Sequence, residues 1–223
     1  MSEQHALLPI SDSLKKSLET ASSGYCAALQ LTPAMDDYLT AERCLPPETV
    51  RAARLGYVDE PAPGHVHVAG RLAIPYYCLA STVTGIRFRC LEAHDCKAIK
   101  CPKYLAIADV DTRLYFTYTY RRDHPDVHVT EGEIDALTLA SLGLNVIGIP
   151  GANAWRPRWT RVLEGHQRVF VWGDPDEAGQ KFNKTVTRAV RHAVPVPLED
   201  HDVNGTHTAL GAETLLEYLS LAA

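Results

Sequence analysis

The second half of the chain alternates between short apolar runs and longer segments with helical periodicity. The runs at 127–132, 145–151 and 167–174 are rich in β-branched and aromatic residues, and the run at 194–198 is shorter. Each run is followed by a segment that predicts a helix. Short strands that alternate with helices at this spacing favour a parallel sheet covered by helices. The expected helices cover residues 133–143, 154–165, 177–193 and 212–223.

The first half has a different pattern. We expect a long helix at 11–30 and two shorter helices at 33–44 and 46–57. A segment at 59–65 that is rich in proline and glycine predicts turns. Alternating apolar positions then predict four strands, so the first 120 residues favour an α+β arrangement. The expected strands cover residues 65–70, 71–80, 85–91 and 113–120.

The composition is that of an ordinary globular protein. The chain has 223 residues, of which 46% are apolar and 22% are charged. A chain of this length buries enough surface to fold without a disulfide or a metal. No apolar run approaches the ~18 residues of a membrane span, and the N-terminal residues lack the basic-then-apolar pattern of an export signal. We therefore expect a cytoplasmic protein with no membrane partner.

Charge is unevenly distributed along the chain. The net charge of −5 excludes a general basic coat for nucleic acid. Residues 87–122 nevertheless hold eight Lys and Arg side chains against four acids, and nine of the 27 acids lie in three short clusters beyond position 130. This distribution suits a metal site beside a ligand that carries phosphate. The three clusters are Glu131, Glu133 and Asp135; Asp174, Asp176 and Glu177; and Glu199, Asp200 and Asp202.

Two of the acidic clusters directly follow predicted strands. Glu131 comes after one strand, and Asp174 and Asp176 come after another, while Gly132 and Gly179 allow close backbone approach. Because open α/β sheets bind ligands at the carboxyl ends of their strands, we expect these carboxylates to lie close together. Mutual repulsion and burial would raise their pKa values unless a cation neutralises them. Oxygen ligands of this kind favour Mg²⁺, and acids that only cap the following helix are the alternative.

The acidic segments also resemble a known family. VTEGEIDAL, followed by VFVWGDPDEAGQK and then by the acid of HDVNG, resembles the TOPRIM signature of bacterial-type primases, topoisomerases and some nucleases. Four preceding segments resemble successive elements of the bacterial DnaG-type primase catalytic core, and the resemblance covers nearly the whole chain after residue 36. These segments are YLTAERCLPPETVRAARLGYV, RLAIPYYCLASTVTGIRFRC, CPKYLA and RLYFTY.

The resemblance implies a fold and a domain organisation. It implies an α/β TOPRIM domain, with a mainly parallel sheet flanked by helices, preceded by a smaller α+β primase N-terminal subdomain. On this basis residues 1–35 form an N-terminal helical segment, 36–122 form the basic subdomain on the template and nucleotide side, and 123–223 form the metal-binding TOPRIM domain. The implied protein is a compact phage or mobile-element DNA primase, which synthesises short RNA primers during replication in a bacterium or an infected host cell.

The resemblance also assigns roles to residues. Glu131, Asp174 and Asp176 match the main catalytic metal ligands, and Asp202 matches a later acid of the family. Mg²⁺ is the implied cofactor, with Mn²⁺ as the alternative ion. A 3′-hydroxyl would attack the α-phosphorus of a ribonucleoside triphosphate, and pyrophosphate would leave. Residues matching positions that bind nucleotide or template are Arg87, Arg89, Lys103, Tyr104 and, by a looser alignment, Arg113.

Departures from the family pattern affect the site and its partners. Ala106 stands where the motif has Asn, and Gly205 stands where it has a final acid, which puts one polar contact and a second metal position in question. The zinc-binding module that usually precedes this region and the helicase-binding region that usually follows it find no match. We therefore expect single-stranded DNA and ribonucleoside triphosphates as ligands, and a replicative helicase or a separate zinc-binding or helicase chain in trans.

One group of cysteines has no assigned role. Cys90, His94, Cys96 and Cys101 follow the pattern C-x₃-H-x-C-x₄-C. The chain contains no C-x-x-C pair, and this spacing fits no standard zinc site, so zinc is not expected and reduced or structural residues are favoured.

Two other functions stay open. A TOPRIM phosphodiesterase would cut nucleic acid with the same metal, and a non-catalytic module would bind single strands or nucleotides within a larger replisome. The motifs around Lys103 and Arg87 favour the primase. Oligoribonucleotide products made on a single-stranded template, as opposed to template fragments, separate the first two functions.

Overall fold

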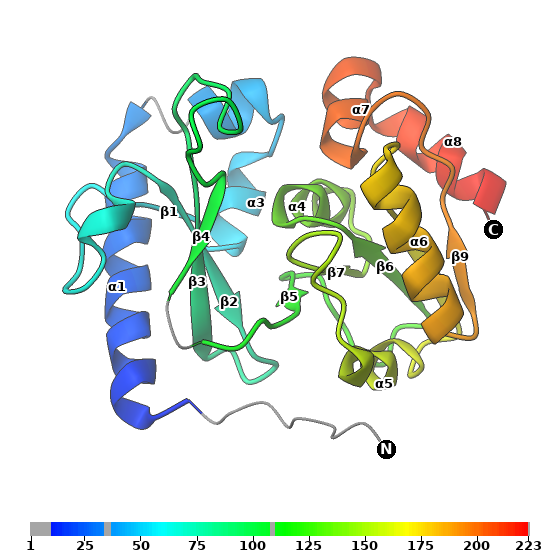
Figure 1. Cartoon of the computed structure of the whole chain (residues 1–223), viewed down its shortest axis with the longest axis horizontal. Coiled ribbons are helices and arrows are strands. Elements are labelled where there is room, and N and C mark those ends of the chain that lie inside the picture. The colour runs from blue at the N-terminus through cyan, green and yellow to red at the C-terminus, as the bar shows by residue number, and fades with distance from the viewer. Residues whose placement is uncertain (1–9, 34–36, 108–109, 223) are drawn as a thin grey trace. The chain divides into compact units, whose positions relative to one another are not determined.

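The computed structural model describes residues 10–33, 37–107 and 110–222. Within these residues the chain forms two units, each with its own sheet (Figure 1). The antiparallel-sheet unit comprises residues 10–33, 37–41, 50–107 and 110–111. The parallel-sheet unit comprises residues 42–49 and 112–222. Across the described residues, no helix has both the length and the hydropathy that a membrane span requires.

The antiparallel-sheet unit is built on four strands in the order β1-β2-β3-β4. These are β1 (Gly56–Tyr57), β2 (Leu72–Tyr77), β3 (Val83–Arg89) and β4 (Tyr104–Ala106). Each strand pairs with its neighbour in antiparallel fashion, and β2 and β3 form the longest ladder. The strands β3 and β4 are joined by a loop of fourteen residues, 90–103, which carries the three cysteines and the histidine of the C-x₃-H-x-C-x₄-C pattern.

The helix α1 (Asp12–Gln30) packs on this sheet. It begins where the Ser11 hydroxyl accepts a hydrogen bond from the Leu14 N–H. Leu18 and Tyr25 lie on its buried face, in one apolar cluster with Phe88 of β3. α1 also lies close to β1, because a Cβ at Gly56 would be 2.6 Å from the Tyr25 Cβ.

Three segments of this half differ from the sequence prediction. The expected strand at 65–70 is wrong, since Val66–Val68 form the 3₁₀ helix η2. In a strand the two valines would lie on the same face, but Val68 is buried while Val66 is 76% exposed. The expected helix at 46–57 is shorter, since α3 (Pro47–Ala52) ends before Arg54, which has a positive φ of 51°. In the expected helix at 33–44, residues 34–36 lie outside the described residues, and Asp37–Glu42 form the π-helical turn η1.

The parallel-sheet unit has five strands in the order β5-β7-β6-β8-β9. Neighbours among the last four run parallel, and β5 alone runs antiparallel to β7. The strands are β5 (Tyr115–Phe116), β6 (Asp126–Thr130), β7 (Val146–Gly148), β8 (Arg168–Trp172) and β9 (Ala193–Pro195). The strand expected at 113–120 is thus reduced to two residues. The reason is that the chain turns directly after Thr117, whose carbonyl accepts from the Tyr120 N–H at 3.1 Å.

Helices cover this sheet as the strand–helix alternation predicts. α6 (Glu177–Ala189) packs on β8 and β9, and its Phe182 and Val186 share an apolar cluster with valines of β6 and β8. Trp159 of η3 (Pro157–Trp159) and Leu163 of α5 (Thr160–Leu163) join the same cluster. The remaining helices are α4 (Glu133–Ser141), which packs on β6, β7 and α7, then α7 (Val203–Leu210) and α8 (Ala212–Ala222).

The helix α7 has no counterpart in the sequence prediction. Its first turn contains Asn204 and Gly205, which are typical of turns. The helix forms because the Asp202 side chain caps it by accepting from the Gly205 N–H at 2.6 Å, and because Val203 and Asn204 are buried. Tertiary contacts therefore override the local signal.

Candidate metal centre

The carboxyl ends of β6 and β8 lie side by side. The two strands are parallel neighbours, and Thr130 at the end of β6 pairs with Trp172 at the end of β8. Glu131 follows the first strand directly, and Asp174 follows the second after one glycine. The pairing therefore brings these two acids to the same edge of the sheet, where open α/β sheets bind their ligands.

Three aspartates gather in this unit. One carboxylate oxygen from each of Asp135, Asp174 and Asp202 lies within 4.8 Å of the other two. Asp135 belongs to the first turn of α4, and Asp202 is the N-cap of α7. Three carboxylates this close repel one another unless a cation lies among them. A donor set made only of carboxylate oxygens fits a hard divalent ion such as Mg²⁺.

Asn204 fixes two members of this cluster relative to each other. Its backbone N–H donates to the Asp135 Oδ1 at 2.9 Å, and its side-chain amide donates to the Thr138 Oγ1 at 2.9 Å and to the Arg43 carbonyl at 2.8 Å. Asn204 is 2% exposed, so these bonds are protected from water. They tie the start of α7, and with it Asp202, to α4.

Glu131 contributes a half-buried carboxylate beside this cluster. Burial raises the pKa of Glu131, and the negative charges of Asp176 and Asp135 raise it further, while the backbone N–H groups of Asp174 and Ala152 oppose the shift. Its Oε2 is buried and has no hydrogen-bond partner among the described residues. A buried carboxylate oxygen without a donor fits the role of a metal ligand, because a cation would offset both burial and repulsion.

Asp176 has a different immediate contact. It is the N-cap of α6, and its Oδ1 accepts from the Gly179 N–H at 2.8 Å. Asp176 is exposed and does not belong to the group of three aspartates. The same kind of cap occurs at Asp202, which does belong to that group, so capping a helix does not keep an acid out of the cluster. The role of Asp176 as a ligand stays a prediction.

Glycines keep the backbone tight around these acids. A Cβ at Gly179 would lie 2.1 Å from the Asp174 carbonyl oxygen and 2.3 Å from its nitrogen. A Cβ at Gly132 would lie 3.1 Å from the Asp135 Oδ2. The first contact excludes any side chain at Gly179, since α6 begins directly against the backbone of Asp174.

Basic and aromatic residues meet on the antiparallel-sheet unit. Arg89 of β3 pairs with Tyr104 of β4, and its Nη1 donates to the Tyr104 hydroxyl at 2.5 Å. The guanidinium of Arg87 lies over the same ring, 4.5 Å from its centroid. Lys103 is exposed next to this pair, whereas Arg113 belongs to the parallel-sheet unit. Four of the five predicted nucleotide- or template-binding residues therefore lie on the paired strands β3 and β4 or directly next to them.

Arg89 is less accessible than the sequence suggests. It is only 8% exposed. Burial opposes its charge, but the Tyr104 and Tyr38 hydroxyls outweigh burial and raise the pKa of the guanidinium. Arg89 is therefore placed to hold Tyr104, while Arg87 and Lys103 are the more accessible cations.

Comparison with known proteins identifies the family. A family model described as Toprim-like matches residues 128–209. The Gene 57 protein of Mycobacterium phage D29 is 37% identical over 153 residues, which cover 66% of this chain and 97% of the phage protein. The chain belongs to the same family as this phage protein, and it contains a Toprim-like domain. The three aspartates and Glu131 all fall within the residues that the Toprim-like model matches.

Solved structures of primases share the fold. The Aquifex aeolicus primase, with its zinc-binding and RNA polymerase domains, superposes with a TM-score of 0.78 at 22% identity over 96% of this chain. A DNA primase domain from Pseudomonas aeruginosa gives 0.75 at 20% identity, covering 93% of this chain and 78% of that one. This chain spans 62% of the Aquifex aeolicus structure. The matches confirm the expected fold class, a Toprim domain with the smaller α+β subdomain of the DnaG catalytic core.

Asp135 is the site residue that sequence reasoning missed. The sequence places it in an acidic cluster, but only Glu131 of that cluster was expected to bind metal. Asp135 lies four residues after Glu131, so the first turn of α4 returns its side chain toward the sheet edge. This spacing in the Toprim motif is a signal that could have pointed to it.

Proposed function

We propose that this chain is the catalytic core of a phage-type DNA primase, which synthesises short RNA primers on single-stranded DNA by divalent-metal-dependent nucleotidyl transfer. The observation that carries the proposal is the meeting of Asp135, Asp174 and Asp202, with Glu131 beside them, in a chain that has the fold of the primase core. A Toprim-like domain and a phage relative support the same conclusion.

The acids of the Toprim domain would hold the ion. Asp135, Asp174 and Asp202 would coordinate Mg²⁺, with Mn²⁺ as the alternative, and Glu131 and Asp176 would supply further oxygens. A bound ion there would lower the pKa of the attacking 3′-hydroxyl and stabilise charge that develops on the α-phosphate. The protein's own contribution is orientation, since the N–H groups of Asn204 and Gly205 hold the Asp135 and Asp202 carboxylates in fixed directions.

The basic residues would bind the charged substrates. Lys103 and Arg87 would contact triphosphate or template phosphate through charge-assisted hydrogen bonds, and Tyr104 offers a ring on which a base can stack. Arg89 would act as a positioning residue, because its guanidinium holds the Tyr104 hydroxyl. Arg113 would add a further cation. We place the reaction in the cytoplasm of a bacterium or infected cell, with a replicative helicase or another chain in trans as partner.

A primer-synthesis assay tests the proposal. The protein is incubated with labelled ribonucleotides, single-stranded DNA and Mg²⁺, and the Asp174→Asn variant is compared with the matched control Asp123→Asn, which alters an exposed acid outside the site. We expect oligoribonucleotides from the wild type and the control, and a loss of at least about 100-fold in Asp174→Asn, the size of effect typical for a group that stabilises transition-state charge. The assay includes a replicative helicase in a parallel arm.

Two outcomes reject the primase. Template fragments without ribonucleotide products identify a phosphodiesterase. Template binding that is equal in the wild type and Asp174→Asn, with neither product, identifies a non-catalytic module.

A further inference from the structure

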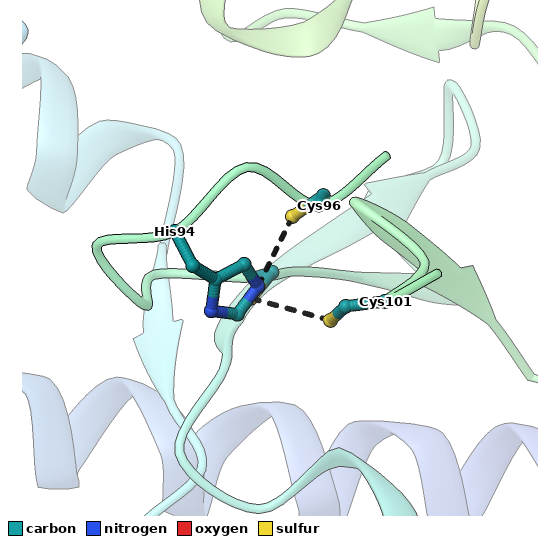
Figure 2. A group of neighbouring side chains, drawn as sticks. His94, Cys96 and Cys101 are labelled. Atoms are coloured by element: carbon teal, nitrogen blue, oxygen red, sulfur yellow. Dashed lines mark hydrogen bonds between the residues drawn. The ribbon is translucent and has the colours of Figure 1, made fainter. Parts of the chain in front are cut away.

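The loop between β3 and β4 brings three cysteines and one histidine together. One ligand atom from each of Cys90, His94, Cys96 and Cys101 lies within 4.8 Å of the other three. Figure 2 shows His94, Cys96 and Cys101 directed toward a common point from different parts of this loop. All four residues are partly buried, and all lie within the antiparallel-sheet unit. This convergence weakens the expectation, drawn from spacing alone, that zinc does not bind here.

The distances match the edges of a tetrahedron around one ion. The Cys90 and Cys101 Sγ atoms are 3.8 Å apart. The His94 Nε2 lies 3.6 Å from the Cys90 Sγ and 3.5 Å from the Cys96 Sγ. For tetrahedral zinc with Zn–S of about 2.3 Å and Zn–N of about 2.0–2.1 Å, these edges are about 3.8 Å between sulfurs and about 3.6 Å between sulfur and nitrogen.

A disulfide and a set of thiol hydrogen bonds both fit these contacts less well than a metal ion. A disulfide needs sulfurs about 2.05 Å apart, far closer than the 3.8 Å between Cys90 and Cys101. Hydrogen bonds between thiols and the imidazole account for only part of the cluster, because a single ring nitrogen, Nε2, faces both Cys90 and Cys96. That nitrogen of a neutral imidazole offers one proton or one lone pair, and cannot serve two sulfurs well.

The surrounding loop is built to hold the four side chains. Cys90 extends the β3–β4 ladder, since its N–H donates to the Lys103 carbonyl at 2.9 Å. The Asp95 Oδ1 accepts from the Lys97 N–H at 2.8 Å and from the Ala98 N–H at 3.3 Å, which turns the chain between Cys96 and Cys101. These bonds fix both ends of the loop and its central turn.

A nearby cation balances the charge of the cluster. Arg71 donates from Nη2 to the Cys101 Sγ at 3.4 Å and from Nη1 to the Pro102 carbonyl at 2.8 Å. Three thiolates and a neutral imidazole around Zn²⁺ carry one net negative charge. The guanidinium of Arg71 offsets that charge and supports one of the ligands.

We propose that Cys90, His94, Cys96 and Cys101 form a structural zinc site of the Cys₃His type. Four protein ligands close the coordination shell, which is typical of zinc that stabilises a loop and leaves no open position for catalysis. The ion would hold the exposed Lys97, Lys100 and Lys103 in a fixed arrangement on this loop. The inference does not depend on primer synthesis, since the ligands belong to a different unit from the carboxylates.

Metal content tests the site directly. The full chain is produced in zinc-supplemented medium, purified under reducing conditions and analysed by mass spectrometry for metals. We expect about one zinc per chain, retained in the control variants Asp174→Asn and Cys78→Ser and reduced to less than about a tenth in Cys96→Ser and Cys101→Ser. Zinc that is absent from the wild type, or equal in all variants, overturns the proposal.

Cobalt substitution gives a readout that needs no variant. The wild-type protein is stripped with a chelator and titrated with Co²⁺ in the absence of oxygen. We expect thiolate-to-cobalt charge-transfer absorption with the intense visible bands of a tetrahedral site, and displacement of both by Zn²⁺. A titration with no charge-transfer band overturns the site, as does a mass spectrum showing two of the three cysteines joined in a disulfide in freshly purified protein.

Trypsin digestion tests the structural role. Lys97 and Lys100 are exposed but lie within a loop whose backbone the ion would hold in place, so removing the ion should loosen this backbone enough for trypsin to bind and cleave it. We expect cleavage at these two lysines to be at least about tenfold faster after chelation and slow again after Zn²⁺ is restored. Cleavage rates that do not respond to either treatment contradict a structural ion.

Discussion

His128 should make the stability of the Toprim domain depend on pH. The ring is 3% exposed, stacks on Phe170 with centroids 5.0 Å apart, and its Nδ1 accepts from the Trp172 Nε1 at 3.1 Å. Burial lowers the pKa of His128 from 6.5 to about 4, with His124 and Arg168 adding to the shift and Asp126 opposing it. The folded protein therefore holds a neutral ring with its proton on Nε2.

The sign and size of the effect follow from the two pKa values. The unfolded chain takes up a proton on His128 near pH 6.5, and the folded chain does so only near pH 4. The contribution of His128 to stability is thus complete above pH 6.5 and is lost as the pH falls toward 4. The full loss is about 3 kcal/mol, and the loss between about pH 7.5 and about pH 5 is about 2 kcal/mol.

Urea unfolding followed by tryptophan fluorescence reports on the parallel-sheet unit, which contains His128. All three tryptophans, Trp155, Trp159 and Trp172, lie in the parallel-sheet unit. The free energy of unfolding is compared at the two pH values in the wild type and in His128→Asn. The variant loses stability at both, but we expect the wild type to lose about 2 kcal/mol more than the variant on acidification. An equal pH dependence in the two proteins would refute the assignment of a buried neutral imidazole.

Two further predictions concern the backbone and the basic surface. Gly179→Ala should destabilise the protein by about 2–3 kcal/mol, because its Cβ would meet the Asp174 carbonyl at 2.1 Å. Gly24→Ala, in a helix interior with nothing within 4 Å of the new Cβ, should stabilise it by about 0.5–1 kcal/mol. Urea unfolding followed by circular dichroism gives the change in the free energy of unfolding for each variant. Equal changes in the two variants would contradict the steric argument. Lys103→Ala should weaken single-stranded DNA binding uniformly across sequences and reduce the slope of log affinity against log salt by about 1. Fluorescence anisotropy at several salt concentrations measures that slope, and an unchanged slope would remove Lys103 from the phosphate contacts.

The strand–helix alternation was predictable where burial and local pattern agree. The valines of β6 and β8 are β-branched, which favours strands, and they are fully buried in the core of this unit. The local pattern and the tertiary packing therefore favour the same structure. The parallel pairing of these strands then follows from the helices between them, and with it the approach of Glu131 to Asp174. The resemblance to primases carried the prediction further, to the α+β subdomain.

Elements fixed by tertiary contacts were not predictable. The segment at 65–70 alternates like a strand, yet Val66 faces solvent and the chain turns between two glycines with positive φ, Gly64 at 84° and Gly70 at 74°. The sequence at the start of α7 is typical of a turn, and only the burial of Asn204 explains why a helix forms there. The sequence did not single out Asp135 as a metal ligand, and it did not predict that the four residues of the cysteine loop converge, because their proximity depends on a helix turn or on a closed hairpin.

Manganese binding measured by electron paramagnetic resonance tests the central claim most directly, because the signal of free Mn²⁺ disappears as the ion binds. The wild type, Asp174→Asn and the control Asp123→Asn are titrated under the same conditions. If the carboxylates bind a metal ion together, we expect at least one bound Mn²⁺ in the wild type and the control, and we expect Mg²⁺ to displace it. The affinity for Mn²⁺ should be about tenfold or more weaker in Asp174→Asn. Equal Mn²⁺ affinity in all three proteins would contradict a metal centre at this edge of the sheet.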